Sequence, residues 1–318
     1  MKTWLKKNWL KKLAVTCAAI PFAQCAMAPG HNVASAAEPA AATAPVATTD
    51  ADPALWVVKD EDTTIYLFGT IHVLKPGLGW FDEAVKQAFD KSDQLMLEII
   101  LPDDQAAMAQ KMIPLAIDQS GKTLSSRLSP DELKAYQAAM TSVGIPPAQF
   151  DMFEPWFAAM TLSIAPLAKL GYDPEQGAEK TLTASAKAAD KPVSGLETIE
   201  EQLGFFDGLP EKEQLVFLNA TVKDIDQLGP TLDKMVVSWS KGDPDALAAL
   251  MNDSMEATPE LAKTLLFDRN ARWADKLKAR MDQPGTVFVA VGAGHLAGKH
   301  SVQDYLKERG LTAERVKY

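Results

Sequence analysis

TIYLFGTIH, residues 64–72, and TVFVAVGAGH, residues 286–295, are the two stretches that decide the fold of this chain. Each is a short apolar run typical of a buried strand, and each leads directly into a Gly-x-x-His pattern. Each strand therefore delivers a histidine, His72 or His295, at its carboxyl end. In open α/β sheets ligands bind beyond the carboxyl ends of the strands. We therefore predict that these histidines, 223 positions apart, share one site.

The residue types in these motifs strengthen the prediction. Gly69, Gly292 and Gly294 let the backbone turn sharply or approach a ligand closely. The chain has four histidines, and the other two, His31 and His300, fall in a low-complexity segment and a polar loop. A turn histidine satisfied by its own hydrogen bonds is the alternative for either motif alone. The recurrence of the motif favours a functional pair.

The pattern along the rest of the chain predicts an α/β fold. Residues 55–59 and 64–69 form a hairpin, because both are β-prone and a short acidic run separates them. A helix at 81–92 and an apolar strand at 95–101 then complete a β-α-β unit. Strands are also predicted at 191–196, 286–291 and, as an edge strand, 312–316; helices begin near 130, 153, 177, 198, 210, 244, 259 and 302. This order predicts a mixed central sheet with helices on its faces and a helical insertion in the middle of the chain.

Two carboxylates are candidates for the same site. Glu98 interrupts an apolar strand, where an ionised carboxylate is costly unless a cation, a metal or hydrogen bonds compensate it. Glu197 directly follows the strand at 191–196, so it also lies at a carboxyl end. The alternatives are an exposed edge carboxylate for Glu98 and, for Glu197, a charge that stabilises the next helix terminus.

The helix that begins at Pro259 carries a cation on its apolar face. Arg269 shares a stripe at spacing four with four apolar residues, Leu261, Leu265, Trp273 and Leu277. Asn270 lies on the neighbouring stripe. A buried guanidinium requires a carboxylate or an anionic substrate group, and Glu98 or Glu197 could supply the carboxylate. A purely structural ion pair is the alternative.

Several common chemistries are excluded by the sequence. It contains no H-E-x-x-H zinc motif, no G-x-S-x-G nucleophile motif and no P-loop. Residues 292–297 match G-x-G-x-x-A, but too few residues follow to build a dinucleotide-binding domain. The formal net charge of −10 argues against nucleic acid as a partner, because phosphate binding needs a basic surface.

The first 28 residues predict export. Five lysines precede the apolar stretch 13–23, and Ala26-Met27-Ala28 has the form of a signal-peptidase site. That stretch is shorter than the roughly 20 residues that span a bilayer, so we expect no stable membrane anchor. The leader also contains both cysteines, which leaves no disulfide or thiol nucleophile after cleavage at Ala28. Residues 29–53, rich in Ala, Pro and Thr, predict a flexible tether, and 54–318 one folded domain in the periplasm.

Several separated motifs resemble the TraB/GumN family, which is related to the Tiki proteins. They occur in order between residues 54 and 318: Leu55-Trp56, residues 66–72, Gly195-Leu196-Glu197-Thr198 with Gln202, Arg269-Asn270 with Trp273, and residues 291–296. The family's paired Gly-x-x-His motifs map onto Gly69 to His72 and Gly292 to His295. Its acidic strand position maps onto Glu98.

The resemblance implies a hydrolase. Tiki-like members are described as metal-dependent proteases of secreted proteins, and TraB-like members are linked to the control of peptide pheromones. A divalent ion, Mn, Co or Zn, would be held by His72, His295 and Glu98. Glu98 or Glu197 would be a ligand or general base, and Arg269 with Asn270 would orient the site or stabilise a developing oxyanion.

The expected substrate is therefore an extracytoplasmic peptide or secreted protein. One departure from the family is the predicted free, exported state, since the Tiki and TraB branches are membrane-associated. Two alternatives stay open. One is a metal-free hydrolase with a histidine base, by analogy with the erythromycin-esterase group, and the other is a periplasmic protein that binds a peptide without cleaving it. The sequence predicts no particular oligomeric state.

Overall fold

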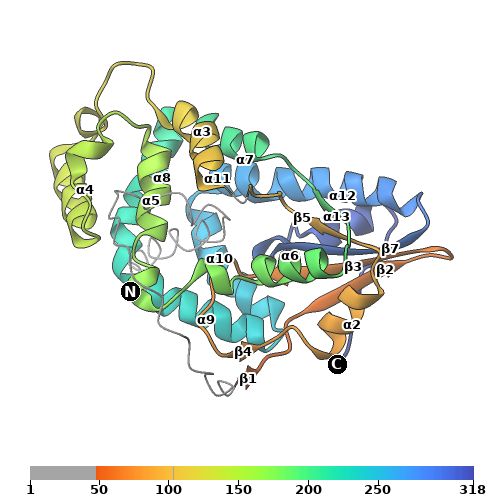
Figure 1. Ribbon diagram of the computed structural model, residues 1–318. Helices are drawn as coiled ribbons and strands as arrows, with labels where there is room; N and C mark the ends of the chain where they lie inside the picture. The colour runs from red at the N-terminus through yellow and green to blue at the C-terminus, as the bar shows by residue number, and fades with distance from the viewer. Residues whose placement is uncertain (1–47, 103) are drawn as a thin grey trace, which may run out of the picture.

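A six-stranded mixed sheet forms the centre of the computed structural model, which describes residues 48–102 and 104–318 (Figure 1). The strand order is β6-β5-β7-β3-β2-β8. Four neighbouring strands run parallel: β6 (Val193–Gly195), β5 (Gln94–Leu97), β7 (Gly285–Gly292) and β3 (Thr63–Thr70). β2 (Leu55–Lys59) is antiparallel to β3, and β8 (Glu314–Arg315) is antiparallel to β2. The prediction of a mixed α/β sheet is confirmed.

The register of the parallel strands brings their carboxyl ends level. β7 pairs with β3 along its whole length, up to Thr70 opposite Gly292. On its other side β7 pairs with β5, where Leu97 lies opposite Ala290. The apolar sequence of β7 fits this central place, because a strand in a parallel sheet is buried on both faces. The residues that follow these strands must therefore lie at one edge of the sheet.

Helices cover both faces of the sheet (Figure 1). On one face the aromatic residues Phe68 and Phe288 belong to an apolar cluster with α2 (Glu83–Lys91), α6 (Ala178–Ala188), α9 (Leu228–Ser240) and α10 (Pro244–Ala257). On the other face Leu67 and Val289 pack with Trp273 and Leu306 from α12 (Asp268–Met281) and α13 (Val302–Glu308). The alternation of these strand residues between two clusters follows from the two-residue period of a β-strand.

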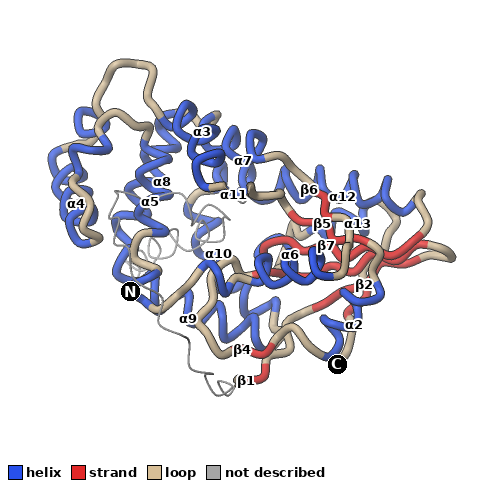
Figure 2. Tube along the Cα trace, in the orientation of Figure 1, coloured by secondary structure: helices blue, strands red, loops and turns tan. Residues whose placement is uncertain are grey.

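The predicted helical insertion in the middle of the chain is also present, and Figure 2 shows these helices gathered at one end of the sheet. Its apolar cluster joins α3 (Gln105–Ala116), α4 (Pro130–Ser142), α5 (Pro155–Ile164), α7 (Ile199–Asp207), α8 (Glu211–Asp224) and α11 (Pro259–Ala262). The Thr198 side chain accepts the Glu201 N–H at the start of α7, and the Glu201 side chain accepts the Thr198 N–H, as the capping-box pattern predicts. This cap fixes where the chain turns after β6.

Two predicted boundaries differ from the structure. The strand predicted at 95–101 ends at Leu97. Its neighbour β6 has only three residues, and the next residue, Glu98, accepts the Gly292 N–H with its side chain and not with its backbone. At the amino end, β1 (Thr49–Asp50) pairs with β4 (Leu78–Gly79), and Ala51 is buried. Folded structure thus begins before the predicted boundary at residue 54, because a short backbone pairing orders a segment whose composition favours a tether.

The predicted leader, residues 1–28, and the tether up to residue 47 lie outside the described residues. In the part of the chain that the structure describes, no helix is long and apolar enough to cross a membrane.

Candidate active site

Each of the four parallel strands ends next to a buried polar side chain. His72 lies two residues beyond β3, Glu98 directly follows β5, Glu197 lies two residues beyond β6, and His295 lies three residues beyond β7. Their exposed fractions are only 6–7%. The structure thus brings together both predicted histidines and both predicted carboxylates. Arg269 and Asn270 join them from α12 and are equally buried.

Gly292 leaves the space in which three of these side chains meet. A Cβ atom on Gly292 would lie 3.1 Å from Glu98 Oε1, 3.5 Å from His72 Nε2 and 3.7 Å from His295 Cδ2. The Gly292 N–H donates to Glu98 Oε1 at 2.6 Å. Glycine is needed here for space alone, because any side chain would enter the centre of the site.

Glu98 is held as a carboxylate by surrounding donors. Its Oε2 accepts from Arg269 Nη2 at 2.8 Å and from Gln202 Nε2 at 3.1 Å. Burial alone would raise the pKa of Glu98, but the neighbouring His295 and Arg269, together with the Gly292 N–H, lower it to about 2. Glu98 is therefore ionised under all ordinary conditions.

Arg269 ties the two carboxylates together. Its Nε and Nη2 atoms donate to Glu197 Oε2 at 3.0 and 2.8 Å, in addition to the bond to Glu98. The guanidinium lies 4.8 Å from the centre of the Trp273 ring, a cation-π contact. The sequence predicted either Glu98 or Glu197 as its partner, and the structure has both. Sequence reasoning gave no role to Gln202, whose amide donates to both carboxylates.

His295 is fixed in one tautomer by its neighbours. Asn270 Nδ2 donates to the His300 carbonyl at 2.7 Å, which turns Asn270 Oδ1 toward His295 Nδ1 at 2.5 Å. The proton of His295 is therefore on Nδ1, and Nε2 carries a lone pair that faces Arg269 Nη1 at 3.3 Å. Burial is the main cause that lowers the pKa of His295 to about 3, so the imidazole is neutral.

We expect long-range proton–nitrogen NMR spectra to show His295 as a neutral ring with its proton on Nδ1 near neutral pH. Replacing the acceptor, Asn270→Leu, should give a mixture of tautomers, because only the longer Arg269 contact at Nε2 would then favour the proton on Nδ1. The resonances of His72 serve as the internal control, since Asn270 does not contact that ring. A positively charged His295 in the wild-type protein would contradict this arrangement.

His72 is held from α6. Its Nδ1 lies 2.5 Å from Glu179 Oε1, an oxygen that also accepts from the Thr70 hydroxyl. Burial works to lower the pKa of His72, but the Glu179 charge and hydrogen bond outweigh it and raise the pKa. The other ring nitrogen, Nε2, is buried and has no hydrogen-bond partner among the described residues. Sequence reasoning missed Glu179, because a carboxylate in the first turn of a helix is common.

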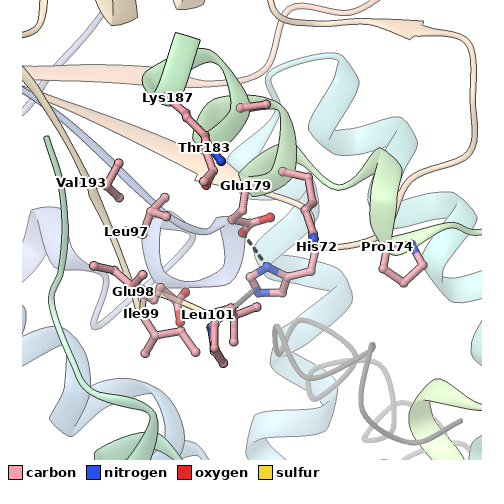
Figure 3. Close-up of a pocket in the computed structure, with 14 residues that line it drawn as sticks. His72, Leu97, Glu98, Ile99, Leu101, Pro174, Glu179, Thr183, Lys187 and Val193 are labelled. Atoms are coloured by element: carbon pink, nitrogen blue, oxygen red, sulfur yellow. Dashed lines mark ion pairs between the residues drawn. The ribbon is translucent and has the colours of Figure 1, made fainter. Parts of the chain in front are cut away.

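A cleft of about 570 Å³ opens beside this pair of residues (Figure 3). His72, Glu98 and Glu179 line one part of it, and Figure 3 shows the His72–Glu179 contact as a dashed line. Apolar residues that follow β5, including Ile99 and Leu101, form another part of the wall. The unpartnered Nε2 atom of His72 therefore belongs to a side chain that a ligand in the cleft can reach.

The nitrogen and oxygen atoms of this site are of the types that bind a divalent metal. Neutral imidazole nitrogens and a carboxylate are the ligands that Zn, Mn and Co take in proteins, and His72 Nε2, His295 Nε2 and Glu98 Oε1 supply them. The cradle over Gly292 and the orphaned His72 Nε2 fit such a group. In residues 48–102 and 104–318, however, no group of three His, Cys, Asp or Glu side chains is already spaced to hold an ion. Arg269 Nη1 contacts His295 Nε2, the nitrogen through which His295 would bind an ion.

The fold and site define a class: an α/β protein with a buried ionic cluster where four parallel strands end. Within that class the chain belongs to the TraB/PrgY/gumN family, whose sequence profile matches residues 54–315. The resemblance seen in the separated motifs is thereby confirmed.

The sequence identity to individual relatives is low. The chain is 28% identical over 255 residues to the uncharacterized protein YbaP of Escherichia coli, which covers 80% of this chain and 92% of YbaP. It is 25% identical over 273 residues to an uncharacterized protein of Treponema pallidum, covering 80% of each. It is 23% identical over 323 residues to metalloprotease TIKI2 of Danio rerio, covering 85% of this chain and 62% of TIKI2. No solved structure matches the chain significantly.

Proposed function

We propose that this protein is a metal-dependent hydrolase that cleaves a peptide or secreted protein outside the cytoplasm. The observation that carries the proposal is the convergence of His72 Nε2 and Glu98 Oε1, with His295 beside them, on the position that a Cβ of Gly292 would occupy. The distant similarity to metalloprotease TIKI2 supports the type of reaction. The leader pattern in residues 1–28 supports the location.

The residues that would hold the metal are His72, His295 and Glu98, and His295 Nε2 would exchange its Arg269 contact for the ion. A divalent ion bound there would lower the pKa of a water molecule and polarise a substrate carbonyl. In the net reaction one water adds across an amide: its oxygen bonds to the carbonyl carbon, the C–N bond breaks, and the leaving amine takes a proton.

The chain's other residues keep these three in place. In the neutral His72 ring, Glu179 favours the proton on Nδ1 and leaves the lone pair on Nε2. Asn270 does the same for His295. Glu197 is engaged by Arg269 and Gln202, so its role is to position the guanidinium. Arg269, which also contacts Glu98 and His295, holds these two side chains in place.

A metal-free hydrolase is the second candidate, and the His72–Glu179 contact favours it. A histidine that lines a cleft, with a carboxylate beside Nδ1 and no partner at Nε2, is the arrangement of a general base. In this reading His72 takes a proton from water.

The test combines metal content with turnover. We expect wild-type protein, supplied with manganese, cobalt and zinc, to bind one ion in near-stoichiometric amount, and His72→Ala and His295→Ala to lose it while remaining folded by circular dichroism. Glu179→Gln should weaken metal binding or activity by roughly 10- to 100-fold, because it removes the group that orients His72. Hydrolysis of a fluorogenic peptide library should fall in the same variants.

His300→Asn is the matched control. Its side chain is exposed, its backbone has a φ of 60° that asparagine tolerates, and only its carbonyl contacts Asn270. It should keep both metal and turnover. Turnover without metal would favour the histidine base, and peptide binding without any turnover would leave a binding protein.

A further inference from the structure

The cleft beside His72 carries opposite charges at its two ends. Helix α6 lines it with Glu179, Thr183 and Lys187, which recur at spacing four and therefore lie on one face of the helix. Glu179 belongs to the site, since it contacts His72. Lys187 lies eight residues further along the helix, about 12 Å away at the rise of 1.5 Å per residue. An extended peptide covers that distance in roughly three to four residues.

Lys187 is the free cation of this cleft. It is exposed, and no ion pair or side-chain hydrogen bond is formed by it within the described part of the chain. Lys180, the other lysine in the lining, lies 3.3 Å from Glu175. The acidic groups of the lining, Glu98 and Glu179, are both engaged at the His72 end. The far end is thus positive in a protein whose formal net charge is −10.

The wall opposite α6 is apolar. Leu97 and Val193 line the cleft across from α6, and Ile99 and Leu101 continue this lining near Glu98 (Figure 3). Ile100, which also lines it, is 51% exposed, one of few large apolar side chains in the described residues with that much solvent contact. An apolar wall with a single unpaired cation at the end is suited to a ligand with apolar side chains and one carboxylate.

We propose that the cleft binds an extended peptide alongside α6, with apolar side chains against residues 97–101 and a carboxylate at Lys187. The peptide bond three to four residues before that carboxylate then lies at His72. This inference rests on the proposed hydrolase function for the cleavage, but peptide binding and the preference for a carboxylate do not require turnover. The carboxylate is either the carboxyl terminus of the peptide or an Asp or Glu side chain.

The experiment measures binding of three dye-labelled hexapeptides of alanine and leucine to the mature protein by fluorescence anisotropy at low salt. One ends in a free carboxylate, one in an amide, and one in an amide with glutamate as its last residue. We expect wild-type protein to prefer the free carboxylate over the plain amide by about three- to fivefold, since an exposed ion pair contributes that much, and high salt to reduce the preference. Lys187→Gln should abolish it.

Lys134→Gln is the matched control, because Lys134 is an exposed lysine on α4 that lies outside the cleft. It removes the same charge and should keep the preference. Protein stripped of metal with a chelator should also keep it, which separates this inference from the proposed function. If the glutamate peptide binds like the free acid, a side-chain carboxylate suffices; if it binds like the amide, the terminus is required. No peptide binding, equal binding of all three, or an unchanged preference in Lys187→Gln would overturn the proposal.

Discussion

Replacing Arg269 with methionine is expected to lower the free energy of unfolding by about 3–5 kcal/mol, because it leaves two buried carboxylates without their cation. Glu98 and Glu197 both bond to this guanidinium, and both are nearly inaccessible to water. Urea unfolding followed by circular dichroism measures the change. The loss should be smaller in mild acid, since a buried carboxylate without a cation has a raised pKa and the folded state then takes up protons.

Two comparisons identify the cause of that loss. Arg272→Met removes a neighbouring arginine that is half exposed and 3.8 Å from Glu197, and it should cost less than about 1 kcal/mol. Adding Glu98→Gln and Glu197→Gln to Arg269→Met should restore part of the stability, because the unpaired charges are removed. A stability loss for Arg269→Met no larger than that of Arg272→Met would show that the carboxylates find compensation elsewhere.

Gly177→Ala should strongly destabilise this protein, because the added methyl group has no room. A Cβ at Gly177 would lie 2.2 Å from the His72 carbonyl oxygen and 3.0 Å from that of Pro174, both backbone atoms that cannot rotate away. The φ of −58° and ψ of 147° suit alanine, so the obstacle is the contact alone. We expect a loss of about 3 kcal/mol by overpacking, and reduced metal retention and turnover as the His72 segment moves from α6.

Gly204→Ala makes the same chemical change, but we expect it to raise the free energy of unfolding. Gly204 lies within α7, and an added Cβ would meet nothing within 4 Å. Alanine is the better helix former, so this variant should gain roughly 0.5–1 kcal/mol. If both variants unfold at the same urea concentration as the wild type, the close approach of α6 to His72 is not rigid.

Much of the fold could be predicted because its signals are local. The apolar runs around residues 64–69 and 286–291 became β3 and β7, and the Thr198 cap began α7 as expected. The position of β7 between β3 and β5 could not be predicted, because pairing of parallel strands depends on contacts between distant segments. The end of β5 at Leu97 was missed for the same reason, since its length is set by a short neighbour.

The sequence identified most residues of the candidate site, but not the hydrogen bonds and contacts that hold them in place. Scarce histidines after strand ends and an arginine within an apolar stripe stand out in any sequence, and the structure places all of them together. Glu179 and Gly177 carry no such mark, and Gln202 was named only within a family motif, without a role. Each acts through a partner that is distant in the chain or through a backbone approach, and neither is visible before the chain is folded.

The central position of β7 also determines when this sheet can form. Residues 285–292 lie near the end of the chain, yet they pair with β3 from 222 positions earlier and separate it from β5. Until they are made, β3 and β5 have no common neighbour, and the ring of side chains around Gly292 does not exist. Such non-local closure makes folding slow. A chain that lacks these residues therefore has open strand edges prone to aggregation, and the site assembles only after β7 and His295 have been synthesised.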